Sequence, residues 1–158
     1  MSITLRPAKP GDGAILQTMV RELATHHGPG EEFRASPEDF ERFLSDPQPV
    51  GGAIIALWEG APAGCAIWHR SFSPFRGSET LYMEDISVLP AHRRKGIGRE
   101  LLKAVARLAL ARKLPAVTWL MMGWNAEARR FYEEAGAEIE DGNCFCKLSG
   151  EALERLGS

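Results

Sequence analysis

Apolar residues recur along the chain in short runs, some alternating with polar residues and some continuous, and turn residues bound each run. This pattern predicts β-strands. The runs are residues 3–6, 53–58, 63–70, 81–89 and 117–122, with a last pair at 137–140 and 144–148. The turn residues at 59–62 predict a tight hairpin, and residues 71–79 predict a looser loop before the fourth strand. The pair near the end of the chain predicts a second hairpin.

Helical periodicity separates these strands in several places. The first predicted helix carries apolar residues at helical spacing, namely Ile15, Leu16, Met19, Val20 and Leu23. Asp12 is placed to cap this helix, and Ser36 opens a second, shorter one. A third amphipathic helix covers residues 98–112, and Asn125 caps a fourth that Gly136 ends.

The predicted elements follow the order β-α-α-β-β-β-α-β-α-β-β, and a short helix begins at Gly150. Adjacent strands in the first half and strands alternating with helices afterwards predict a mixed α/β fold, mostly antiparallel in that half. A chain of 158 residues is long enough for one well-packed core. We therefore expect a single domain over residues 1–158.

Composition narrows the classes of function. The formal net charge of −2 at pH 7 disfavours nucleic acid as a partner, because binding to a phosphate backbone needs a basic surplus. No apolar run approaches the length of a membrane span, and no apolar leader is present, so we expect no membrane partner. The odd count of 3 cysteines without a secretory signal indicates reduced thiols in a cytoplasmic protein.

The turn between the fourth strand and the third helix has the composition of an anion-binding site. Its residues are Arg93, Arg94, Lys95, Gly96, Ile97 and Gly98. The first N–H groups of a helix have no partners within the helix, and the positive end of the helix dipole lies there. The glycines let a diphosphate approach the backbone without meeting a Cβ, and the cations add positive charge. The turn therefore predicts a phosphate cradle.

Two common phosphate-binding motifs are excluded. A P-loop needs a lysine followed by Ser or Thr, and a dinucleotide-binding turn needs a third glycine and a later acid. Arg99 and Leu101 follow Gly98 instead. A basic turn whose glycines serve only geometry stays an alternative. The remaining pattern, Arg-x-x-Gly-x-Gly, resembles the acetyl-CoA loop of the GNAT family of N-acetyltransferases.

Further motifs carry the resemblance in the same order along the chain. They are residues 3–8 and 81–85, Trp124-Asn125, Phe131-Tyr132, Gly136-Ala137 and Gly150-Glu151-Ala152. Together they resemble the diamine (spermidine/spermine) acetyltransferases and their thialysine-acetylating relatives. The resemblance implies an α/β fold with a mixed, mostly antiparallel GNAT-type sheet, flanked by helices and splayed at its central strands. It also implies a homodimer built with the last strand and the C-terminal tail.

The resemblance implies where the co-substrate acetyl-CoA binds. Its pantetheine arm would lie against the backbone of Ile86, Ser87 and Val88. Its diphosphate would lie on Arg93, Arg94, Lys95, Gly96, Ile97, Gly98 and Arg99. Asn125 and Ala128 would add contacts, although a helix cap by itself also explains Asn125.

Two adjacent acids in the fourth strand suit the amine substrate. An alkylammonium must lose a proton before it attacks a thioester, which costs about 4–5 kcal/mol at pH 7. A carboxylate can bind the cation and accept that proton. Glu84 and Asp85 would point to opposite faces of a regular strand, but a β-bulge can bring both to one side. An exposed strand charge is the alternative for each, and the resemblance favours Glu84 as the base and Asp85 as a second substrate contact.

The departing thiolate needs a proton donor, and Tyr132 is the candidate. It lies one helical turn after Ala128. A phenol gives its proton to a thiolate at a cost of only about 2 kcal/mol. A Phe-Tyr pair on a helix usually packs in a core. The resemblance implies that Tyr132 is instead the general acid.

Two departures from the polyamine enzymes concern the substrate. His26 and His27 stand where those enzymes have a tyrosine and a glutamate, and Asn143 stands in place of a tryptophan. The loss of an acid and an aromatic ring disfavours a long polycation. The histidines could bind a substrate carboxylate, and a solvated helix end is the alternative. No metal site is expected, because Cys144 and Cys146 lack a second pair of ligands.

These inferences combine into one expected function. We expect a cytoplasmic enzyme that transfers an acetyl group from acetyl-CoA directly to a primary amine of a small molecule. The amine would belong to a diamine, a polyamine or a thialysine-like amino acid. Two alternatives stay open: an acetyl-CoA-binding sensor without transfer activity, and acetylation of protein lysines or N-terminal amines.

Overall fold

The computed structural model describes residues 2–28 and 32–157. These residues group into two compact units, one extending to Leu120 and the other beginning at Met121. The first unit contains the sheet and three α-helices, and the second contains two short helices joined by an extended segment.

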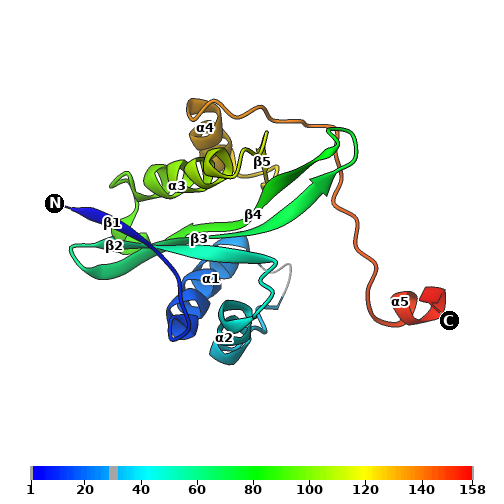
Figure 1. Ribbon diagram of the computed structural model, residues 1–158, viewed down its shortest axis with the longest axis horizontal. Coiled ribbons are helices and arrows are strands. Elements are labelled where there is room, and N and C mark those ends of the chain that lie inside the picture. Colours follow the sequence, from blue (N-terminus) through cyan, green and yellow to red (C-terminus); the bar gives the residue numbers. More distant parts are fainter. Residues whose placement is uncertain (1, 29–31, 158) are drawn as a thin grey trace. The chain divides into compact units, whose positions relative to one another are not determined.

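A five-stranded sheet organises the described residues of the first unit (Figure 1). Its strands lie in chain order: β1 (Ile3–Pro7), β2 (Gly51–Trp58), β3 (Ala61–Ser73), β4 (Ser78–Val88) and β5 (Val117–Thr118). The pairs β1–β2, β2–β3 and β3–β4 are antiparallel, and β4–β5 is parallel. The prediction of a mixed, mostly antiparallel sheet is therefore confirmed.

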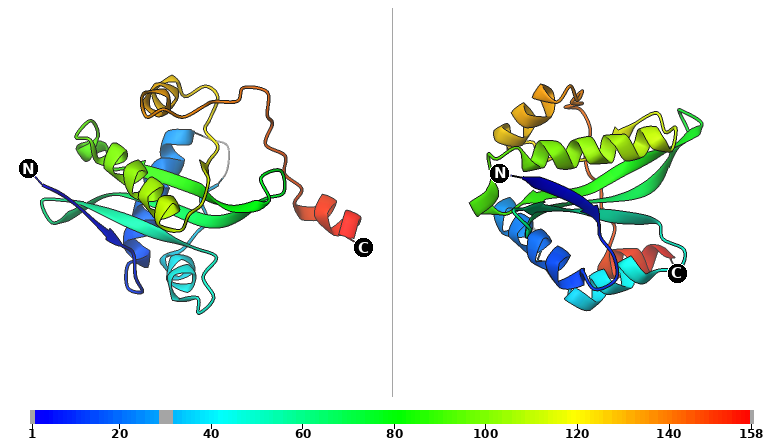
Figure 2. Two further views of the ribbon diagram at one scale, coloured as in Figure 1. Left: turned by 45° about the horizontal axis from the view of Figure 1, so that its top comes forward. Right: turned by 60° about the vertical axis from the view of Figure 1, so that its left-hand side comes forward.

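Helices cover both faces of this sheet. Figures 1 and 2 show α1 (Gly13–His27) and α2 (Pro37–Ser45) on one face and α3 (Ile97–Ala111) on the other. On the first face, Leu16 and Met19 of α1 pack with Ile55 and Cys65 of the sheet. A Cβ at Gly64 would lie 2.6 Å from the Ser87 carbonyl oxygen and 3.3 Å from the Ile97 and Leu101 side chains of α3, so this position needs glycine for the close approach of β4.

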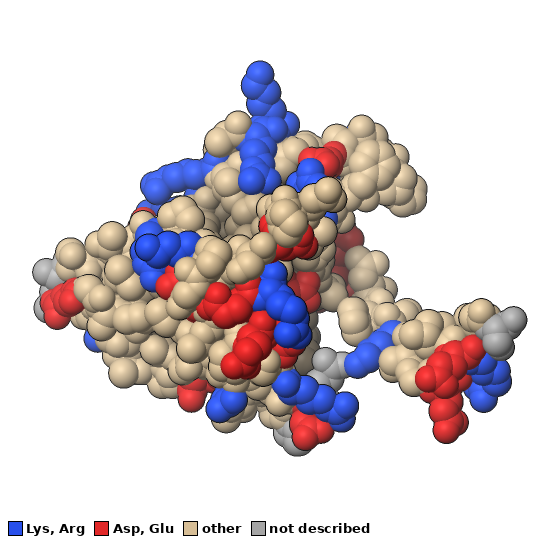
Figure 3. All heavy atoms as spheres, turned by 60° about the horizontal axis from the view of Figure 1, so that its bottom comes forward, with Lys and Arg blue, Asp and Glu red and all other residues tan. Residues whose placement is uncertain are grey.

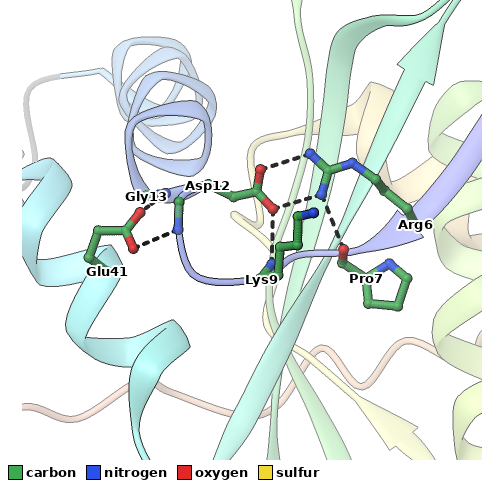
Figure 4. A network of polar contacts seen from close by, with 7 residues as sticks. Arg6, Pro7, Lys9, Asp12, Gly13 and Glu41 are labelled. Atoms are coloured by element: carbon green, nitrogen blue, oxygen red, sulfur yellow. Dashed lines mark hydrogen bonds and ion pairs between the residues drawn. The ribbon is translucent and has the colours of Figure 1, made fainter.

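The start of α1 departs from the prediction that Asp12 caps it. The Asp12 side chain makes no cap hydrogen bond and instead binds the Arg6 guanidinium at 2.6 and 2.7 Å (Figure 4). That ion pair holds the pKa of Asp12 below its ordinary value. Glu41 of α2 binds the start of α1 instead. Its carboxylate accepts hydrogen bonds from the backbone N–H groups of Gly11 and Gly13 at 2.8 and 2.5 Å.

The other helix boundaries follow their sequence signals closely. The Ser36 hydroxyl accepts a hydrogen bond from the Asp39 N–H at 3.2 Å, and the Asp39 carboxylate accepts one from the Ser36 N–H. Together these two bonds make a complete capping box for α2. In the second unit, α4 (Ala126–Glu134) begins at Asn125 and ends at Gly136 in the left-handed conformation. A final helix, α5 (Gly150–Gly157), begins at the predicted residue.

Three strand predictions were wrong in extent. The loop expected at 71–79 shrinks to residues 74–77, because β3 and β4 pair as far as Ser73 and Ser78. The strand expected at 117–122 stops at Thr118. Residues 137–140 and 144–148, all described, form no strand, and the side chains from Cys144 to Leu148 are exposed. A two-stranded hairpin without a buried face is marginal by itself, which explains that absence.

Candidate active site

A β-bulge interrupts the central strand β4 at Glu84. Asp85 pairs with Ile67, and Met83 pairs with the next residue of β3, Trp68. Glu84 therefore has no partner in β3 and is the additional residue of the bulge. Both acids can serve one site only if such a bulge is present, and β4 contains it.

The bulge changes which side chains share a face. Paired residues of neighbouring strands project to the same side, so Tyr82 lies with His69, and Asp85 lies with Ile67. Because Ile67 belongs to the core cluster under α1, this is the α1 face of the sheet. In an unbroken strand, Tyr82 and Asp85 would point to opposite faces, since they are an odd number of residues apart. The extra residue brings them to the same one.

Glu84 is the more accessible of the two acids. Its side chain is 57% exposed, and its Oε2 lies 3.3 Å from Nε2 of His69. The His69 ring stacks on the Tyr82 ring with centroids 5.0 Å apart. Sequence reasoning missed His69 and Tyr82 as members of this group. The sequence does show a histidine near the end of a mostly apolar strand. That His69 contacts Glu84, however, depends on the register between β3 and β4, which the sequence alone does not give.

Asp85 is partly buried, and its environment disfavours the charged form. Burial raises the pKa of Asp85 to about 6, and the adjacent Glu84 carboxylate adds to the shift. The pKa values of two neighbours on this face, Cys65 and Tyr82, are raised as well. Burial and then the charge of Asp85 raise the pKa of the Cys65 thiol to about 12. Burial and then the charge of Glu84 raise the pKa of Tyr82. The α1 face of the sheet therefore holds two carboxyl groups beside a partly buried region of low polarity.

The predicted phosphate cradle forms the beginning of α3. Pro90–His92 make a short 3-10 turn after β4, and the chain then reaches Gly96 with φ of 82°. This left-handed conformation favours glycine, and it directs the chain into the first turn of α3. Gly96 carries no capping side chain, so the first N–H groups of the helix keep their capacity to bind an anion.

Cations surround this helix terminus. Arg93, Arg94, Lys95 and Arg99 are all exposed, whereas Ile97 is buried and anchors the turn. The Arg93 Nε donates to the Val88 carbonyl at 3.2 Å, which ties the cradle to the end of β4. Lys95 lies over the Trp58 ring at 4.9 Å. The half-buried Gly98 lies in the first turn of α3.

The backbone beside the cradle belongs to the second half of β4. Within the described residues, β5 pairs only with Leu81 and Tyr82, so Met83 and residues 85–88 pair with β3 alone. This early separation is the splay that the resemblance implied. Ser87 is oriented toward α1, where its hydroxyl donates to the Met19 carbonyl at 2.9 Å. Ile86 and Val88 alternate with it and project toward the α3 side.

The predicted residues of the second unit lie on α4. The Asn125 side chain accepts from the Ala128 N–H at 3.0 Å, which confirms its role as a helix cap. Tyr132 is 7% exposed, and its ring lies 5.1 Å from that of Phe131. The Tyr132 carbonyl accepts from the Ala137 N–H at 3.0 Å, part of the hydrogen bonding that ends this helix.

The predicted histidines lie at the end of α1. His26 is exposed, and the side chain of His27 lies outside the described part of the structure. Charges of both signs are interspersed on the face drawn in Figure 3, so that face presents no field of a single sign.

Residues 17–137 match the sequence profile of a protein family described as "Acetyltransferase (GNAT) family". This match covers most of the chain. The chain belongs to the GNAT family of acetyltransferases. The expectation of an acetyltransferase is thereby confirmed.

Two curated relatives of this GNAT protein act on amino acids, according to their names. The chain is 29% identical to a thialysine N-epsilon-acetyltransferase of Bos taurus over 166 residues, covering 98% of this chain and 96% of the relative. It is 32% identical to an L-ornithine N5-acetyltransferase of Arabidopsis thaliana over 118 residues, covering 75% of this chain and 48% of the relative.

Solved structures support the GNAT fold. An integron cassette protein from the mobile metagenome of V. cholerae superposes with a TM-score of 0.79 at 24% identity, covering 99% of this chain and 98% of the other. An aminoglycoside acetyltransferase from a soil metagenome superposes with a TM-score of 0.77 at 17% identity, covering 93% and 97%. At these identities the likeness concerns the fold.

The described part of the chain offers neither a cluster of metal ligands nor a helix suited to a membrane. In residues 2–28 and 32–157, no group of three or more His, Cys, Asp or Glu side chains is arranged to hold a metal ion. Among the helices of the same residues, none combines the length and the apolar character that crossing a membrane requires.

Proposed function

We propose that this GNAT protein transfers an acetyl group from acetyl-CoA directly to a primary amine of a small molecule. The observation that carries the proposal is the bulge at Glu84. It gathers an exposed and a partly buried carboxylate near one another on β4, and β4 leads directly into the basic turn. Such a pair suits an ammonium group, and such a turn suits a diphosphate.

The residues present fit acetyl-CoA. The beginning of α3 offers uncapped N–H groups and four exposed cations, and Gly96 leaves the approach free of a Cβ, with nothing within 4 Å of that position. We assign the pantetheine arm to the backbone of Ile86, Ser87 and Val88, which lies beyond the last residue paired with β5. When bound, acetyl-CoA supplies an activated thioester.

The amine side of the reaction falls to the two acids. Asp85 and Glu84 would attract the ammonium, and Glu84 would accept its proton, because its carboxylate is accessible and the neutral amine alone is nucleophilic. Reaching the neutral amine costs about 4–5 kcal/mol at pH 7 in water. A carboxylate that accepts this proton in the bound complex, before the amine attacks, lowers that cost.

We assign protonation of the departing thiolate to Tyr132. This role rests on the resemblance of the Phe131-Tyr132 motif. The structure of α4 supports the assignment. Tyr132 is a nearly buried phenol on this helix, and hydrogen bonds fix both the start and the end of the helix. Asn125 and Ala128 at the start of that helix are the further co-substrate contacts that we propose.

The substrate class that we favour is an amino acid with a distal amine. The names of the bovine and Arabidopsis relatives, thialysine and ornithine acetyltransferases, support this class. Polyamines and diamines are the second class, since they share the distal ammonium. His26 and His27 would bind the carboxylate of an amino acid.

Mass spectrometry of an amine panel incubated with enzyme and acetyl-CoA tests this function. We expect acetylation of thialysine or ornithine at the side-chain nitrogen, and loss of most activity in Glu84→Gln. Glu79→Gln is the matched control, because Glu79 is a similarly exposed acid of the same strand, 51% against 57%. Acetyl-CoA binding without any product would indicate a sensor. Acetylation of peptides alone would indicate a protein acetyltransferase.

A further inference from the structure

The histidine beside the bulge is held by three separate contacts. Its Nδ1 lies 3.1 Å from the Arg70 carbonyl oxygen, and its Nε2 lies 3.3 Å from Oε2 of Glu84. Its ring stacks on Tyr82 at 5.0 Å, with 30° between the planes. A side chain that only covered the sheet would not need both ring nitrogens to be engaged.

These contacts define which nitrogen carries hydrogen. A carbonyl oxygen can only accept, so Nδ1 of His69 must be the N–H donor to Arg70. When the ring is neutral, Nε2 then presents its lone pair to the Glu84 carboxyl group. A contact between this lone pair and a carboxylate is favourable only if one proton lies between them. The pair is therefore built to share a proton.

We propose that His69 is a positioning residue that takes the substrate proton from Glu84 and passes it to water. This inference rests on the proposed function. A proton leaves the substrate ammonium for the Glu84 carboxylate, then moves from Glu84 to Nε2 of His69, and the imidazolium releases it to solvent. Each transfer breaks one N–H or O–H bond and forms another, and no electrons are exchanged. The second proton that the amine loses replaces the one that Tyr132 gives to the thiolate.

The surroundings of His69 suit this relay. The side chain is 38% exposed, so water can reach Nε2. Stacking on Tyr82 and the bond to Arg70 fix the ring, which leaves the proton as the mobile element. Tyr82, Glu84 and Asp85 of β4 are the titratable groups on this side of the strand, and Arg70 is engaged with Glu79 at 3.7 Å.

The kinetic test replaces the ring and then restores its basicity. His69→Ala and His69→Gln should lower kcat by about 10-fold or more, less than the 10²–10⁴-fold typical of a lost general base. Imidazole added to His69→Ala should restore part of the rate, whereas pyrazole, a ring of the same size and far weaker basicity, should not. Arg70→Gln is the control: it breaks the neighbouring ion pair and should respond to neither compound.

Two kinetic outcomes would overturn the relay. One is His69→Gln turning over at the parental rate, and the other is equal rescue by imidazole and pyrazole, which would indicate a space-filling role.

A measurement without substrate separates this proposal from the proposed function. Nitrogen-15 NMR of the parent protein should find His69 protonated at Nδ1, and Glu84→Gln should change the Nε2 resonance. A ring protonated at Nε2 alone would overturn the proposal even in an active enzyme. If no amine in the panel is acetylated, the proposed function fails, and the NMR result still decides whether the pair shares a proton.

Discussion

At the scale of single residues, the site depends on the environment of two neighbouring carboxyl groups. Glu84 lies in the bulge and is accessible, whereas Asp85 is partly buried, with its pKa raised to about 6. An ionised carboxyl group costs more free energy in such surroundings than in water. The fold therefore keeps Asp85 at the expense of its own stability near neutral pH, as is common for residues of functional sites.

The pH dependence of stability should expose this cost. The folded-state pKa of Asp85 lies above its ordinary value of 3.8, so its contribution favours folding at low pH and is lost as the pH rises through about 6. Asp85→Asn should raise the free energy of unfolding above pH 6, by at most about 3 kcal/mol. The difference should shrink as the pH falls below 6 and vanish below the ordinary pKa of 3.8. Urea titrations across this range measure it, and a difference independent of pH would contradict the assignment.

The proposed acid gives a second prediction at this scale. Tyr132→Phe keeps the ring that packs beside Phe131 and removes the proton. The chemical step should slow by about 10²–10⁴-fold, the usual effect of losing a general acid. Acetyl-CoA affinity should change far less, because the hydroxyl acts as charge develops on sulfur. A variant that turns over at the parental rate, with chemistry limiting, would make Tyr132 a packing residue.

At the scale of elements, helix termini organise each of the two units. Ser36 and Asn125 were predicted as caps, and both make the expected hydrogen bonds at the helices that they begin. Asp12 occupies a cap position as well, but Arg6 draws its carboxylate away by an ion pair. Glu41, distant in sequence, binds the N–H groups at the start of α1. A substitution of the distant residue should therefore destabilise the helix.

We predict that Glu41→Ala lowers the free energy of unfolding by about 1 kcal/mol, the usual effect of losing a cap. The carboxylate holds the N–H groups of Gly11 and Gly13, which would otherwise rely on water. Glu138→Ala, at an exposed acid outside the helices, is the control. Chemical denaturation provides the measurement, and equal stability of the two variants would mean that the bonds to Glu41 contribute nothing.

The beginning of α3 carries the prediction about the co-substrate. Gly98→Val adds two methyl groups and a Cβ in the first helical turn, where the diphosphate would approach the backbone. Acetyl-CoA binding should weaken at least 10-fold, by the steric argument, while the circular dichroism spectrum stays that of the parent. Isothermal titration calorimetry gives the affinity. An unchanged affinity in the folded variant would exclude the cradle.

Local signals in the sequence predicted most of these elements, and contacts between distant segments decided the rest. The two adjacent acids in an apolar strand showed that a bulge could bring both to one side, but an exposed strand charge stayed the alternative for each. The partner of Glu84 could not be inferred, since His69 reaches it only through a register that the bulge itself creates. The strand expected at 144–148 is absent for a similar reason. Its apolar residues were visible in the sequence, but no neighbouring strand was.

At the scale of the whole molecule, the second unit presents apolar side chains to solvent. Exposed large apolar residues of this unit are Met122, Trp124, Phe145, Leu148, Leu153 and Leu156. The edge of a regular strand, from which a dimer was first expected, does not form there. The exposed side chains provide a different reason for the same expectation, since such groups are commonly covered by a partner chain.

We therefore keep the prediction of a homodimer that involves the C-terminal segment. Light scattering at micromolar concentration should give twice the 17.4 kDa mass of the chain. Phe145→Ser should shift the protein toward a monomer, because Phe145 is 74% exposed and would lie in the interface. Phe75→Ser, at a fully exposed residue in the β3–β4 turn, is the control. A parent protein that is monomeric would refute the prediction.

The bulge has a consequence for insertions and deletions. Because Glu84 stands outside the β3–β4 pairing, removal of this residue leaves Met83 opposite Trp68 and Asp85 opposite Ile67. Removal of a paired residue farther along the strand, away from the bulge, would instead turn over the part of β4 that follows it. Glu84 is thus an insertion that the sheet can tolerate losing. A relative with a shorter strand at this point would keep the fold and lack the proposed base, which makes strand length itself a marker of the proposed mechanism.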